Sequence, residues 1–280
     1  MSDRKYTVRT VHIPTEGSTE GAPIRALVFT PTEEPSGIGA LWIHGGGYVG
    51  GMPEMAYASR ARDLVKTFGM TILAPDYRLA GQEPYPAALE DCYAALRYLH
   101  DHAEELGVDP DRIIVGGESA GGGLTAALCI YARDKGEIPI RYQLPLYPML
   151  DCEDTLSSRD NHGINWDTER NHKAWKAYLK NVPGPVPAYA SPARLEDYRN
   201  LPPAYTFVGD GEPFYDETLT FVRKLQEAGV PATVDVYPTK VHAFDIMMPM
   251  RPLSQKARKT FYAQLAIDLE RYVNRRDILS

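Results

Sequence analysis

Short apolar runs alternate with longer amphipathic segments along most of this chain. Runs typical of buried strands lie at 40–43, 71–74, 113–116, 142–147, 204–208 and 233–237. Segments with apolar residues at helical spacing lie at 55–68, 87–106, 123–130, 214–228 and 254–273. In the second of these, Leu89, Leu96 and Leu99 fall on one stripe. The alternation predicts an α/β fold with a mostly parallel central sheet and helices on both faces.

The beginning of the chain follows a different pattern. Segments 6–13 and 24–30 alternate apolar and polar positions, which is typical of strands at an antiparallel edge of a sheet. A length of 280 residues favours one large α/β domain over two. We therefore expect a single domain over 1–280, with a short N-terminal segment at 1–23.

Residues 151–200 interrupt the strand–helix alternation. Trp175, Tyr178 and Leu179 in this segment indicate one amphipathic helix, and a proline-rich run follows at 182–187. Ligands of parallel α/β sheets bind outside the carboxyl ends of the strands. We expect the segment to be a small helical cap inserted over that edge; the alternative is an ordinary connection without a role at a binding site.

The overall composition excludes several classes of function. Hydrophobic residues make up 44% of the chain, and a net charge of −7 argues against binding to nucleic acid or an anionic membrane. The three cysteines are too widely spaced for a disulfide framework or a zinc site, so we expect no metal. There is no apolar run typical of a signal peptide or a membrane span, which favours a cytoplasmic protein.

The strongest chemical signal is the sequence Gly117-Glu118-Ser119-Ala120-Gly121. It stands between an apolar strand-like run and a helix-like run, which is the arrangement of a nucleophile elbow. The turn is so tight that positions 117 and 121 have no room for side chains. This pattern predicts covalent catalysis by Ser119.

A second signal is a glycine-rich loop that follows the first predicted parallel strand, His44-Gly45-Gly46-Gly47. Acyl transfer passes through a tetrahedral oxyanion, which needs N–H donors about 3 Å away. We expect the main-chain N–H groups of Gly45, Gly46 and Ala120 to form this oxyanion hole, with His44 holding the loop. The alternative is a phosphate-binding loop, but the lysine of a P-loop and the spacing of a dinucleotide fingerprint are missing.

A serine nucleophile needs a general base and a carboxylate that orients it. When the nucleophile lies on such an elbow, the order along the chain is Ser, then Asp or Glu, then His. Of the seven histidines, only His242 follows the last predicted strand. Glu212 follows the preceding strand and is our choice for the acid, with Asp216 as the main alternative and Asp210 as a third.

Together these residues resemble the hormone-sensitive-lipase-like group of bacterial esterases in the α/β-hydrolase superfamily. The resemblance runs from about residue 38 to 245 and includes the two glycine motifs, the sequence at 76–80 and the sequence at 84–88. It implies an α/β-hydrolase fold and hydrolysis of carboxylic esters, usually with short acyl chains, without metal or cofactor. The residues themselves predict the triad Ser119, Glu212 and His242, acting through an acyl-enzyme.

Three positions depart from the pattern of this group. The group usually has Asp where this chain has Glu212, and Asp or Thr where it has Glu118, which we expect to tune the elbow rather than react. Its N-terminal cap extension is short here, so a more open site is expected. Members of the group are often dimers, which leaves a homodimer open. The apolar residues 246–250 line the pocket or an interface, or are buried packing.

The same triad serves several other acyl substrates. Acetylated carbohydrates, arylformamides and peptides are alternatives to a simple small-molecule ester. A non-catalytic ligand-binding protein on this fold is the alternative from another class, but such a protein would be expected to lack a triad residue.

Overall fold

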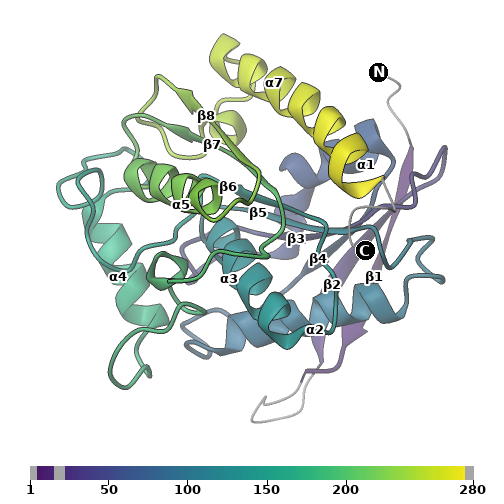
Figure 1. Cartoon of the computed structure of the whole chain (residues 1–280), viewed down its shortest axis with the longest axis horizontal. Coiled ribbons are helices and arrows are strands. Elements are labelled where there is room, and N and C mark those ends of the chain that lie inside the picture. Colours follow the sequence, from purple (N-terminus) through teal and green to yellow (C-terminus); the bar gives the residue numbers. More distant parts are fainter. Residues whose placement is uncertain (1–4, 16–22, 275–280) are drawn as a thin grey trace.

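The computed structural model describes residues 5–15 and 23–274, and its described part contains an eight-stranded sheet with helices on both faces (Figure 1). The strands are β1 (Tyr6–Ile13), β2 (Ile24–Pro31), β3 (Gly39–Ile43), β4 (Thr71–Pro75), β5 (Ile113–Glu118), β6 (Tyr142–Leu146), β7 (Ala204–Gly209) and β8 (Ala232–Tyr237). The expected N-terminal segment 1–23 lies partly outside the described residues, at 1–4 and 16–22.

The strands lie in the order β1-β2-β4-β3-β5-β6-β7-β8. The pairs β1–β2 and β2–β4 are antiparallel, and all strands from β4 to β8 in this order run parallel. The mostly parallel sheet and its antiparallel edge are therefore confirmed. Parallel strands place their carboxyl ends at one edge, where ligands bind in such sheets.

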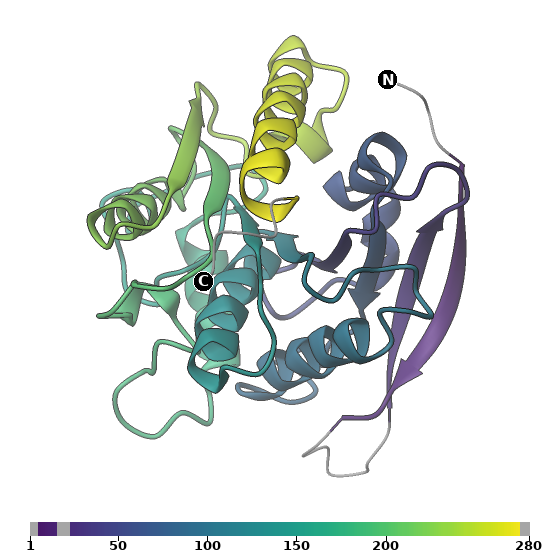
Figure 2. The ribbon, with the colours of Figure 1, turned by 45° about the vertical axis from the view of Figure 1, so that its right-hand side comes forward.

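Helices cover both faces of the sheet. They are α1 (Arg60–Phe68), α2 (Ala87–Asp101), α3 (Ala120–Lys135), α4 (Thr168–Tyr178), α5 (Tyr215–Glu227), α6 (Phe244–Met247) and α7 (Pro252–Asp268). Shorter turns are η1 (Pro53–Tyr57) and η2 (Pro192–Arg194), and a π-helical turn, η3 (Leu269–Val273), follows α7. Helices α1 and α7 pack on one face, whereas α2 and α3 pack on the other (Figure 2).

The two hydrophobic cores follow the alternation of side chains along the central strands. In β3, Leu41 and Ile43 belong to the core beneath α2 and α3, whereas Ala40 and Trp42 belong to the core beneath α1 and α7. A strand with apolar residues at every position thus fills both cores at once, as expected for a strand covered on both faces.

The helix predicted over 55–68 is wrong in its first part. The structure has the 3₁₀ turn η1 there, and α1 begins only at Arg60. Ser59 causes the break, because its Oγ accepts a hydrogen bond from the N–H of Ala61 and so caps the new helix. Two other boundaries also differ, since α2 ends at Asp101 and α3 begins at Ala120, directly after the predicted nucleophile.

Segment 151–200 packs against the glycine-rich loop. Its helix α4 contributes Trp175 and Tyr178, both buried. The ring of Tyr48, just after the three glycines, stacks on Tyr178 with centroids 4.0 Å apart and lies 5.4 Å from that of Trp175. The segment therefore lies at the same edge of the sheet as the predicted reactive residues. In the described part of the chain, no helix is both long and apolar enough to cross a membrane.

Candidate active site

Ser119 stands at a sharp turn between β5 and α3. Its backbone has φ 58° and ψ −118°, a conformation that residues other than glycine rarely adopt. A Cβ on Gly117 would lie 2.5 Å from the carbonyl oxygen of Ile43, and one on Gly121 would lie 2.1 Å from it. Only glycine fits at either position, so the strained turn that raises the serine depends on both.

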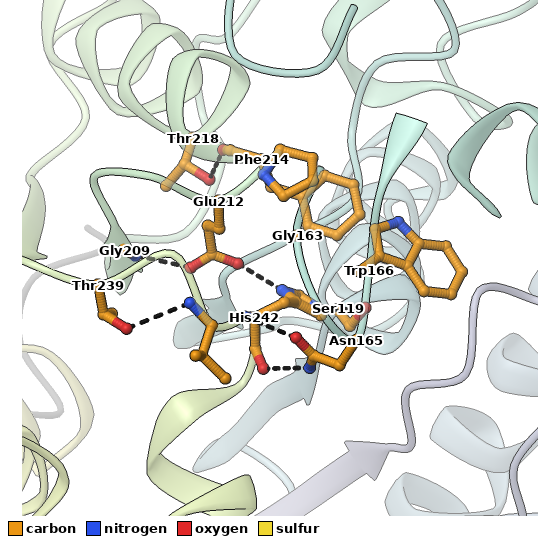
Figure 3. A network of polar contacts seen from close by, with 12 residues as sticks. Ser119, Gly163, Asn165, Trp166, Gly209, Glu212, Phe214, Thr218, Thr239 and His242 are labelled. Carbon is orange, nitrogen blue, oxygen red and sulfur yellow. Dashed lines mark hydrogen bonds and ion pairs between the residues drawn. The ribbon is translucent and has the colours of Figure 1, made fainter. Parts of the chain in front are cut away.

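Ser119 and His242 are in hydrogen-bond contact, and Glu212 lies behind the histidine (Figure 3). The distance from Ser119 Oγ to His242 Nε2 is 2.8 Å. On the other side of the ring, Nδ1 contacts Glu212 Oε2, and the second carboxylate oxygen accepts a hydrogen bond of 2.6 Å from the N–H of Gly209. The arrangement places a base between an alcohol and a buried carboxylate, as general-base activation of a nucleophile requires.

The two alternative acids have other partners. Asp216 Oδ2 accepts a hydrogen bond of 2.7 Å from the N–H of Ser157, in segment 151–200. Asp210 Oδ1 accepts one of 3.1 Å from the N–H of Thr239. Glu212, unlike these two, is in contact with His242, so the geometry favours Glu212 as its partner.

The glycine-rich loop lies directly against the elbow. A Cβ on Gly45 would be 3.3 Å from Ser119 Cβ, and one on Gly46, whose φ is 125°, would be 2.1 Å from a main-chain oxygen of the same loop. Ala120 follows the serine as the first residue of α3. The three expected N–H donors therefore lie in segments adjacent to Ser119, and one is at the positive end of a helix.

His44 holds this loop, as the sequence suggested. Its Nδ1 is 2.8 Å from the carbonyl oxygen of Gly45, and since a carbonyl only accepts, Nδ1 carries the proton. Burial lowers the pKa of His44, which favours the neutral ring. Tyr77 stacks on the imidazole at 4.2 Å, and its hydroxyl donates to the carbonyl oxygen of His44 at 3.0 Å.

Aromatic rings and the segment 151–200 cover the site. Phe214 and Tyr147 lie edge-on to the His242 ring, with centroids 4.9 and 5.2 Å away, and Trp166 lies 6.4 Å away. Only 7% of Ser119 and 5% of His242 is exposed. Trp166 brings segment 151–200 into contact with the glycine loop beside the elbow, and the expectation of a more open site than in the related esterases stays a prediction.

Two residues of the site were not assigned roles from the sequence. Trp166 lies so close to the glycine loop that a Cβ on Gly47 would be 2.3 Å from its Cη2. Asn165, beside it, bonds to the main chain of His242. Their segment has no strong periodicity, so only the placement of a tryptophan and an asparagine in an expected cap could have drawn attention to them.

Glu118 faces away from the reacting atoms. Its Oε2 accepts a hydrogen bond of 2.8 Å from Trp42 Nε1, and its Oε1 accepts one of 3.3 Å from the N–H of Arg60. Burial raises the pKa of this carboxyl to about 8. The side chain thus ties the elbow to β3 and to the start of α1, in keeping with the supporting role expected for it.

The apolar residues 246–250 are not uniformly buried. Met247 is 59% exposed and Met250 is 81% exposed, so buried packing is the wrong interpretation for these two side chains. In the ranges 5–15 and 23–274, no group of three or more His, Cys, Asp or Glu side chains is arranged to hold a metal ion.

The fold and this site define an α/β hydrolase with a serine nucleophile elbow. The family described as having the alpha/beta hydrolase fold matches residues 40–246. Esterase LipI of Mycobacterium tuberculosis is 33% identical over 244 residues, which cover 85% of this chain and 75% of LipI. Ethyl acetate hydrolase of Pseudomonas putida is 30% identical over 249 residues, which cover 87% and 75% of the two chains.

A solved structure of a bacterial heroin esterase superposes with a TM-score of 0.85 at 32% identity, covering 93% of this chain and 83% of that one. The chain belongs to the hormone-sensitive-lipase-like esterases of the α/β-hydrolase superfamily. The resemblance noted from the two glycine motifs is therefore confirmed.

Proposed function

We propose that this carboxylic ester hydrolase acts through Ser119 as nucleophile, His242 as general base and Glu212 as the carboxylate that orients the base. The observation that carries the proposal is the continuous contact from Ser119 Oγ through both ring nitrogens of His242 to Glu212. Glu212 is fully buried. In that position a carboxylate stabilises the imidazolium that forms when the base takes a proton.

The reaction follows from these positions. Ser119 Oγ attacks the ester carbonyl while His242 Nε2 takes the hydroxyl proton, and the carbonyl oxygen becomes an oxyanion. The N–H groups of Gly45, Gly46 and Ala120 hold this oxyanion. Collapse expels the alkoxide, which takes the proton from His242 and leaves an acyl-enzyme. Water, deprotonated by the same histidine, then attacks the acyl group. The bond to Ser119 Oγ breaks, the serine takes the proton back from His242, and the carboxylic acid leaves.

The proposed substrates carry short acyl chains. Ser119 is only 7% exposed, and a Cβ on Gly47 would lie 2.3 Å from the Trp166 ring, which supports a confined site for the acyl group. The relative from Pseudomonas putida is named for the hydrolysis of ethyl acetate. A panel of p-nitrophenyl esters from acetate to decanoate measures this preference, and an optimum at the long end contradicts it. Acetylated sugars, an arylformamide and a peptide in the same panel test the other acyl bonds.

Ser119→Ala tests the nucleophile. Without the hydroxyl no acyl-enzyme forms, so kcat on p-nitrophenyl acetate should fall by about 10³-fold or more. A fluorophosphonate probe should label the unmodified protein and not the variant. Unchanged turnover in the variant would contradict the assignment of Ser119 as the nucleophile. A protein that only binds ligands would neither turn over the ester nor react with the probe.

We also propose that the chain is one hydrolase domain over 1–280, with residues 151–200 as its cap. The contacts of α4 with Tyr48 and of Trp166 with the glycine loop support this division. A homodimer is the proposed assembly, since the resemblance implies it and Met247 and Met250 offer exposed apolar area. Light scattering coupled to size exclusion measures the mass, and a monomer at micromolar concentration contradicts the dimer.

A further inference from the structure

Asn165 binds the main chain of His242 at both of its polar groups (Figure 3). The side-chain Nδ2 donates a hydrogen bond of 2.6 Å to the carbonyl oxygen of His242. The N–H of His242 donates one of 3.2 Å to Asn165 Oδ1. The two residues are 77 positions apart in the chain. The side-chain amide of Asn165 has an acceptor and a donor side by side, so it pairs with the N–H and C=O groups of a main chain as another peptide group would.

The main chain at His242 has little other support. The residue lies in the loop between β8 and α6, and Ala243 after it has a φ of 53°. Among the hydrogen bonds of the described residues, none joins the N–H or C=O of His242 to another main-chain group. Asn165 thus supplies the hydrogen bonds that a neighbouring strand would otherwise make. It satisfies the N–H and C=O groups of His242, which are costly to leave unpaired.

Two residues that shortly precede Asn165 are hydrogen-bonded to the loop that carries Glu212. Ser157 Oγ donates to the carbonyl oxygen of Pro213 at 2.7 Å, and Asn161 Nδ2 donates to that of Gly211 at 3.2 Å. The stretch 157–165 therefore joins the loop of the acid to the loop of the base. The stretch is thus in hydrogen-bond contact with both loops that supply the Glu212–His242 pair.

From these contacts we infer that Asn165 is a positioning residue, which holds the main chain of His242 so that Nε2 points at Ser119 Oγ. The inference rests on the proposed role of His242 as the general base. Both hydrogen bonds of the Asn165 side chain go to His242, so Asn165 acts on the triad through the histidine. Its effect should fall on the rate of proton transfer more than on substrate binding.

Two substitutions separate hydrogen bonding from packing. Asn165→Leu has a similar volume but offers neither donor nor acceptor, whereas Asn165→Ala leaves space for water to reach both main-chain groups. We expect kcat on p-nitrophenyl acetate, per probe-labelled site, to fall by about 10–100-fold in the leucine variant and less in the alanine variant. KM should stay within about threefold of the unmodified enzyme in both. A packing role predicts the opposite order.

Asp167→Ala is the matched control from the same segment. Asp167 caps α4 by accepting a hydrogen bond of 2.8 Å from the N–H of Arg170, so its loss should lower the melting temperature without lowering kcat. The inference is overturned if Asn165→Leu keeps kcat within about twofold, if it loses no more than Asp167→Ala, or if alanine is the worse variant. Ser119→Ala, measured alongside, tests the proposed function separately. If this variant stays active, the serine mechanism itself is wrong, whatever the result for Asn165.

Discussion

Replacing Glu212 by Gln tests the part of the site that the sequence left most open. Two donors converge on this buried carboxylate, the N–H of Gly209 on Oε1 and Nδ1 of His242 on Oε2. Glutamine has the same shape but offers only one oxygen. If that oxygen faces Gly209, the amide NH₂ faces Nδ1, which must then give up its proton to Nε2. A protonated Nε2 cannot accept the proton of Ser119.

The expected loss is large. A carboxamide that imposes the wrong histidine tautomer in a serine triad lowers kcat by about 10⁴-fold. This corresponds to about 5.4 kcal/mol of transition-state stabilisation. The opposite orientation of the amide leaves Gly209 N–H against another donor in a fully buried position and costs stability instead. Initial rates on p-nitrophenyl acetate, with unfolding curves for both proteins, separate the two results.

Asp216→Asn is the matched control. An asparagine there still presents an oxygen to the N–H of Ser157, which now bonds to Asp216 at 2.7 Å. We therefore expect kcat to change by less than about threefold. A larger loss in Asp216→Asn than in Glu212→Gln would refute the assignment of the acid and the tautomer argument with it.

Two further predictions concern stability. Burial raises the pKa of Glu118 from 4.5 to about 8. Between these two pH values the folded protein keeps a proton on Glu118 that the unfolded chain loses. The free energy of unfolding therefore falls as pH rises from about 4.5 to about 8. The slope from this group is at most about 1.4 kcal/mol per pH unit, and Glu118→Gln should remove it in urea titrations; an unchanged slope contradicts the assignment. Gly121→Ala should cost more than about 3 kcal/mol, because its Cβ would meet the carbonyl oxygen of Ile43 at 2.1 Å. Gly81→Ala meets no atom within 4 Å and should change the melting temperature little; equal shifts in both variants argue against the clash.

The architecture and the nucleophile follow from local features of the chain. An apolar run such as 113–116 forms a strand buried on both faces, because every side chain in it needs cover. The elbow after it is equally local, since the lack of a Cβ at Gly117 and Gly121 is what allows the turn. The order of strands along the chain also placed His242 at the carboxyl edge of the sheet.

Other features depend on contacts between residues far apart in the sequence. The choice of Glu212 over Asp216 depends on which carboxylate meets His242, since both follow β7 within a few residues, Glu212 in the loop and Asp216 in the first turn of α5. The helix predicted over 55–68 begins only at Arg60, because the hydroxyl of Ser59 caps a new helix there by accepting a hydrogen bond from the N–H of Ala61. The packing of Trp166 against the glycine loop likewise joins two segments that are far apart in the sequence.

The sequence by itself determined the fold and indicated the proposed nucleophile and base, because hydrophobic periodicity and glycine sterics act between residues that are near each other in the chain. Only the tertiary structure decided how the base is held. Asn165 stands in a stretch without periodicity, and nothing near it in the sequence indicates a partner. Its role follows from a hydrogen-bonded pair across 77 residues, which exists only once the chain has folded.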